Sequence, residues 1–98
     1  MARVLLLSPD LLFSSKVEGA LRAAGHEVVR EGEADAAVVD LTQGELPDPP
    51  AGMRALAFYS HVEQETRRRA EEAGYTLVVP RSRMNREGPA LVERLLGG

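Results

Sequence analysis

The chain has no cysteine and no tryptophan among its 98 residues, and only two phenylalanines and two tyrosines. The absence of cysteine excludes disulfides, thiol catalysis and cysteine-based metal sites. So few aromatic side chains leave no platform on which bases or sugars could stack. Lys16 is the only lysine, and the formal net charge of −3 argues against general binding to nucleic acid or to an anionic membrane.

Long apolar runs are also absent. The opening Met1-Ala2-Arg3 leads into only four apolar residues, too few for the apolar region of a signal peptide or for a membrane span. We therefore expect a cytoplasmic protein without a membrane partner. The length suits one domain, residues 1–98, with a modest core that needs neither metal nor disulfide.

Short apolar runs bounded by turn formers predict five strands, typical of a parallel sheet that helices cover on both faces. The link over residues 31–35 is too short for a crossover between neighbouring parallel strands. We therefore expect the first strand to lie between the second and the third, with the second strand at an edge. The predicted strands are residues 3–7, 27–30, 35–41, 54–59 and 76–79.

Three helices are predicted. The first begins with Ser8 as N-cap and Pro9 at the first helical position, and it ends at Gly25. The second, residues 62–73, is highly charged, so its arginines pair with glutamates three or four residues away. Residues 81–86 are predicted to be a basic loop before a last helix that starts at Gly88-Pro89. The first helix is expected to bury Phe13, Val17, Ala20, Leu21 and Ala24, and the last Leu91, Val92, Leu95 and Leu96.

Candidate functional residues gather at the carboxyl ends of the predicted strands, where ligands bind in open parallel sheets. Asp40 ends the third strand, and three interpretations are open: an inherited surface acid, an ion-pair partner of Arg81 or Arg83, or a phosphoacceptor or ligand contact. Ser60 follows the fourth strand and suits either a helix cap or a switch residue. His26 and His61 have no partner at metal or triad spacing, so no metal site is predicted.

The order strand-helix-strand-strand-strand-helix-strand-helix resembles the receiver domain of bacterial response regulators (the CheY-like superfamily). Asp35-Ala-Ala-Val-Val-Asp40-Leu41 looks like the phosphoacceptor strand, Ser60 falls at the switch position, and Pro80 matches the proline after strand five. The resemblance implies a flavodoxin-like, doubly wound five-stranded parallel sheet in the order 2-1-3-4-5. The helices after strands two and three are expected to be shortened or missing.

The departures from the family's pattern concern its chemistry. Receivers end strand one with two adjacent acids that hold Mg²⁺, whereas here Ser8-Pro9 stand there and only Asp10 follows. Receivers place a lysine before the strand-five proline, whereas here Val79 precedes it and Arg81 comes later. The resemblance therefore implies a degenerate receiver, with no cofactor and no catalytic residue.

Three functions follow as hypotheses. The first is a non-enzymatic signalling module that binds a protein partner or itself; the family's partner face suggests Arg67, Arg69, Tyr75, Arg83 and Leu91. Missing helices would leave one sheet face partly bare, which predicts a homodimer. The second is a binder of a small anionic ligand that uses Ser8, Asp40, Ser60 and the cations Arg81 and Arg83. The third is a minimal phosphoacceptor in which Asp10 and Asp40 hold Mg²⁺.

Overall fold

The computed structural model of the chain describes residues 2–42, 48–60 and 64–97; of Leu11 only the backbone is described. Within these residues the chain forms five parallel strands in the order β2-β1-β3-β4-β5, which confirms the predicted order. β2 is an edge strand, as predicted. The strands are β1 (Arg3–Leu7), β2 (Glu27–Val29), β3 (Ala36–Asp40), β4 (Arg54–Tyr59) and β5 (Leu77–Pro80).

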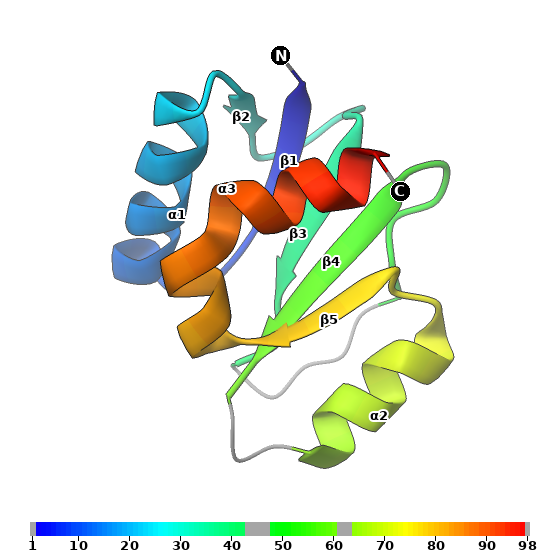
Figure 1. The fold of residues 1–98 in the computed structure, drawn as a ribbon. Helices are drawn as coiled ribbons and strands as arrows, with labels where there is room; N and C mark the ends of the chain where they lie inside the picture. Colours follow the sequence, from blue (N-terminus) through cyan, green and yellow to red (C-terminus); the bar gives the residue numbers. More distant parts are fainter. Residues whose placement is uncertain (1, 43–47, 61–63, 98) are drawn as a thin grey trace.

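The helices lie in two layers, one on each face of the sheet (Figure 1). α1 (Leu11–Ala23) and α3 (Arg81–Gly97) cover one face, and α2 (Gln64–Ala73) lies on the other. No helix follows β2, and none follows β3 in residues 41–42 and 48–53. The predicted loss of these two helices is therefore confirmed where the structure describes the chain. The predicted start of the second helix at residue 62 lies outside the described residues. None of the described helices is long and apolar enough to cross a membrane.

Alternate residues of each central strand enter different cores, because successive side chains of a strand point to opposite faces. Leu6, Leu56 and Phe58 pack under α1 and α3. The rings of Phe13 and Phe58 lie 5.2 Å apart at their centroids and so tie α1 to β4. Asp40 follows Ala36 and Val38 in this alternation, so its side chain lies on the α1 and α3 side of the sheet.

The second face of the sheet is closed, which corrects the predicted bare face. Ala37 and Ala57 are fully buried there, and Leu5 is 6% exposed. Small strand residues let irregular chain lie close to the sheet, so a full helix is not needed to cover it. Met53, before β4, and Tyr75, after α2, pack against this core.

Two helix predictions were wrong in part. Residues 81–86 are helical, because α3 begins at Arg81 directly after β5; the predicted start at Gly88-Pro89 is instead a kink, with non-helical dihedral angles at Glu87. Proline fits a helix start but also a kink within one, because it lacks the N–H that bonds to the preceding turn. In α1, Ala20 and Ala24 are exposed, and Ser14 is buried in their place.

Candidate functional site

Asp40 lies at the end of β3 and is only 7% exposed, so it is not the surface acid of one sequence interpretation. Its Oδ2 accepts a hydrogen bond from Ser8 Oγ at 2.6 Å. Its Oδ1 accepts two, from Thr42 N at 2.8 Å and from Thr42 Oγ1 at 2.6 Å. Short bonds from hydroxyl to carboxylate are strong because the acceptor is charged. The charge of Asp40 is thus stabilised by neutral donors.

Asp10, and not Ser8 as predicted, caps the first helix. Asp10 is the N-cap of α1, and its Oδ1 accepts from Phe13 N at 3.1 Å. The helix therefore begins at Leu11, two residues later than predicted. Ser8 Oγ accepts a hydrogen bond from Asp10 N at 3.2 Å and donates one to Asp40 Oδ2. Ser8 thus links the two acids rather than capping the helix.

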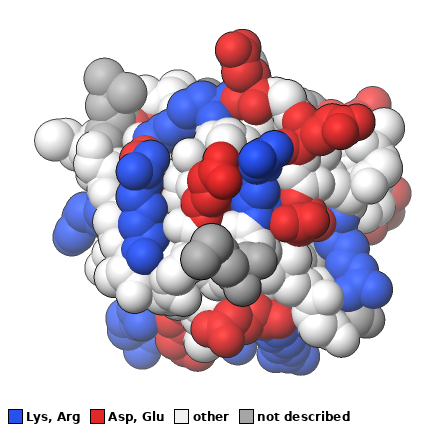
Figure 2. Space-filling view, turned by 90° about the horizontal axis from the view of Figure 1, so that it is seen from above, with Lys and Arg blue, Asp and Glu red and all other residues white. Residues whose placement is uncertain are grey.

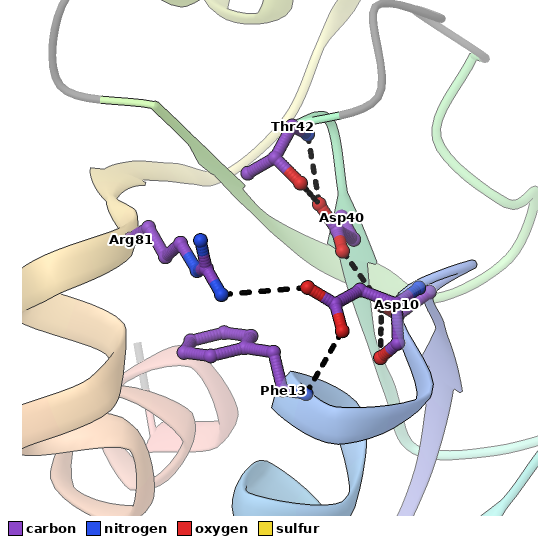
Figure 3. A network of polar contacts seen from close by, with 6 residues as sticks. Asp10, Phe13, Asp40, Thr42 and Arg81 are labelled. Atoms are coloured by element: carbon purple, nitrogen blue, oxygen red, sulfur yellow. Dashed lines mark hydrogen bonds and ion pairs between the residues drawn. The ribbon is translucent and has the colours of Figure 1, made fainter.

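Arg81 pairs with Asp10 and not with Asp40 (Figure 3). Its Nη2 lies 3.4 Å from Asp10 Oδ2, and its guanidinium carbon lies 4.4 Å from the centroid of the Phe13 ring. A cation over an aromatic face gains electrostatic attraction from the ring. Arg83 lies 3.5 Å from Glu87 on its own helix. Of the three interpretations of Asp40, the ion pair with Arg81 or Arg83 is therefore not the one that the structure shows.

The oxygens of the two acids are already engaged within the fold. Both oxygens of Asp10 are engaged, by Phe13 N and by Arg81, and both oxygens of Asp40 accept from Ser8 and Thr42. Mg²⁺ is usually bound through one or two carboxylates in near-octahedral geometry. Among the described residues no group of three His, Cys, Asp or Glu side chains could hold a metal.

Ser60, at the end of β4, lines a hollow of about 500 Å³ at the carboxyl ends of the strands. Arg81 lines the same hollow, whereas Asp40 does not. The sequence did not single out Thr42, although a residue two positions after an aspartate often donates its N–H to that carboxylate in an Asx turn. It also missed Lys16, Ser82 and Asn85, which line the hollow but are brought together only by the packing of α1 and α3.

The interface candidates fall into two groups. Arg67 and Arg69 are exposed on α2 and lie 3.6 and 3.5 Å from Glu71 and Glu65, as the charge pattern predicted. Beside them, Arg68 holds the pKa of Glu65 below its usual value, chiefly through a side-chain hydrogen bond.

Tyr75 and Leu91 are buried, at 6% and 2% exposure, so neither side chain is available to a partner in this structure. This corrects the prediction for both residues. Burial, with a smaller contribution from the charge of Asp48, raises the pKa of Tyr75 to about 12. Arg83 is only partly exposed, since it lies against Glu87 on α3.

The order of the strands and the helices on both faces define a doubly wound α/β protein of the flavodoxin-like class. No protein-family model matches the chain, and no curated protein does. Solved structures of response regulators do match. One match is NtrX from Brucella abortus, with 17% identity and a TM-score of 0.82. The matched region covers 98% of this chain and 27% of NtrX.

Two further matches cover nearly the whole of both chains. A response regulator from Thermotoga maritima has 14% identity and a TM-score of 0.76, covering 98% of each chain. The ChxR receiver domain from Chlamydia trachomatis has 18% identity and a TM-score of 0.70, covering 97% of this chain and 95% of that one. The chain therefore has the fold of a response-regulator receiver domain, as the sequence resemblance indicated.

Proposed function

We propose that the chain is a non-enzymatic, receiver-like signalling module that binds a protein partner in the cytoplasm without phosphorylation of Asp40. One observation carries this proposal: both oxygens of the Asp40 carboxylate accept short hydrogen bonds from Ser8 and Thr42. Phosphoryl transfer to a carboxylate depends on a metal ion and cations that neutralise the transferred group. Here the neighbouring acid, Asp10, is engaged by a helix terminus and by Arg81.

A phosphoryl mimic tests the proposal. Beryllofluoride with Mg²⁺, or a small acyl phosphate with Mg²⁺, is added to the protein, and amide chemical shifts and the intact mass are measured. We expect no adduct, and no shift change around Asp40 and Ser60 beyond that given by Mg²⁺ alone. Asp40→Asn is the matched control. A saturable, Mg²⁺-dependent change in the wild type that Asp40→Asn abolishes would show that Asp40 is a phosphoacceptor.

Self-association is part of the same proposal, but the sheet face no longer supports it. The exposed large hydrophobic side chains of the described residues are Leu7, at 36%, and Leu12, at 84%. Leu7 ends β1 and Leu12 lies in the first turn of α1, so both belong to the end of the molecule that holds Asp40. We place the homodimer contact there, because apolar side chains gain most from being removed from water.

Sedimentation at micromolar concentrations measures this association. Leu12→Gln should shift the protein toward monomer, whereas Ala20→Gln, at another exposed position later on α1, should not. If the wild type sediments only as a monomer, the homodimer is excluded and the partner must be a different protein.

Charge on the molecule's surface supports a protein partner over nucleic acid. Figure 2, a view from above relative to Figure 1, shows acidic and basic side chains interspersed on that face. Arg3 lies 3.3 Å from Glu27, across β1 and β2. Proteins that bind the phosphate backbone of nucleic acids use clustered cations in place of such mixed pairs.

A further inference from the structure

The hollow beside Ser60 adjoins the hydrogen-bond network of Asp40 at Thr42, but Asp40 itself does not line it. Its volume of about 500 Å³ lies within the range of small-molecule sites. α1 contributes Lys16, the end of β4 contributes Ser60, and α3 contributes Arg81, Ser82 and Asn85. These residues come from three separate parts of the chain, so the site exists only in the folded protein.

The polar side chains around this hollow are largely unused by the fold. The side chains of Lys16, Ser60, Ser82 and Asn85 make no hydrogen bond or ion pair within residues 2–42, 48–60 and 64–97. Arg81 makes one long polar contact, at 3.4 Å to Asp10, its guanidinium lies over the Phe13 ring, and its side chain is 48% exposed. Each of these groups therefore keeps donors that can bind a ligand.

Among the described residues that line the hollow, the charges have one sign. Lys16 and Arg81 are cations, and no carboxylate lines the hollow in the described part of the chain. Thr42 also lines it, but the Thr42 hydroxyl already donates to Asp40 at 2.6 Å, so it is left as an acceptor. A site with two cations, two free hydroxyls and an amide favours an anion with many acceptor oxygens.

We propose that this hollow binds a small organic phosphate without covalent chemistry and without Mg²⁺. A carboxylate has two oxygens, whereas a phosphate ester has three terminal oxygens that accept strong hydrogen bonds, which matches the larger number of donors here. Arg81 would be shared between the ligand and Asp10, so binding would act on the residue that caps α1. The proposal stands apart from partner binding and from the modification state of Asp40.

Amide chemical shifts at constant ionic strength, with a chelator present, test it. Glycerol 2-phosphate is titrated, with inorganic phosphate and glycerol as comparisons. We expect saturable shifts at Lys16, Ser60, Ser82 and Asn85 with glycerol 2-phosphate and none with glycerol. Tighter binding of the ester than of inorganic phosphate would support an organic phosphate as the ligand. Tighter binding of inorganic phosphate would contradict it and indicate that the ligand is free phosphate.

Two variants with a matched control locate the site. Lys16→Met should weaken binding roughly three- to fivefold, as expected for one exposed charge contact, and Asn85→Ala should weaken it similarly. Arg86→Met removes one charge from an exposed α3 position that does not line the hollow, so binding should be unchanged. Asp40→Asn should also keep the affinity. Unsaturable shifts, or equal losses in Lys16→Met and Arg86→Met, would overturn the proposal.

Discussion

Ser8 is the hydrogen-bond partner of Asp40 from a distant part of the chain, and its hydroxyl donates to Oδ2 at 2.6 Å. Asp40 is 7% exposed, so little water can replace that donor. Removing one partner of a buried polar group costs the desolvation of the group that remains. The pair therefore couples the end of β1 to the end of β3.

Ser8→Ala should lower the free energy of unfolding by about 1–3 kcal/mol, the cost of an unsatisfied buried acceptor. Urea unfolding measures the change, and Ser15→Ala, an exposed serine on α1, should stay within about 0.5 kcal/mol of wild type. A double-mutant cycle with Asp40→Asn should give a coupling energy of about 0.5 kcal/mol or more. Additive effects would mean that the two side chains do not interact in solution.

Tyr75 gives the fold a dependence on alkaline pH. Its pKa in the folded protein is about 12, against an ordinary value of 10.0, chiefly because of burial. The folded state thus holds the phenol proton more tightly than the unfolded state does. The contribution of Tyr75 to the free energy of unfolding is therefore constant below pH 10 and falls as the pH rises from about 10 to about 12.

Unfolding free energies measured across that pH range should fall less steeply in Tyr75→Phe than in the wild type. Asp48→Asn should lower the pKa of Tyr75 only slightly, since the charge of Asp48 is the smaller cause. Tyrosinate absorbance of the folded protein reports the pKa directly. Parallel pH profiles for the wild type and Tyr75→Phe would contradict the assignment.

At the scale of elements, the start of α1 depends on Asp10, which caps the helix and pairs with Arg81. Asp10→Ala removes both interactions and should cost about 0.5–2 kcal/mol in free energy of unfolding. Asp10→Asn keeps a good cap but loses the charge partner. Because an exposed ion pair contributes little, its cost should stay below about 1 kcal/mol.

Urea unfolding of the two variants separates the cap from the ion pair. Arg81→Met serves as the control, since it removes the ion pair and leaves the cap in place. If Asp10→Asn were as unstable as Asp10→Ala, the contact with Arg81 would be the main contribution of Asp10.

The sequence predicted elements better than it predicted the site, for physical reasons. Buried strands appear as apolar runs, and the short link over residues 31–35 indicated that β1 lies between β2 and β3. The full strand order came from the resemblance to receiver domains. The start of α3 was missed because Pro89 fits both a helix start and a kink, and only packing decides between them. The contacts Ser8 to Asp40 and Asp10 to Arg81 join residues 32 and 71 positions apart, so no local pattern reveals them.

At the scale of the whole molecule, the closed second face explains how a sheet with so few covering helices buries its core. Ala37, Ala55 and Ala57 carry small side chains at the centre of that face, and all three are at most 1% exposed. Interiors of this kind are close-packed, so added volume must displace neighbours. The same face would accept larger side chains freely if it were open to solvent.

Ala37→Leu should therefore lower the free energy of unfolding by about 1–3 kcal/mol, the usual cost of overpacking a core. Ala20→Leu, at an exposed position on α1, should leave stability within about 0.5 kcal/mol of wild type. Urea unfolding of both variants at one protein concentration measures the difference. The opposite result would be an unchanged free energy of unfolding in Ala37→Leu together with a sedimentation shift toward dimer. The second face would then be open in solution, and we would assign the homodimer contact to that face and not to the end of the molecule that carries Leu12.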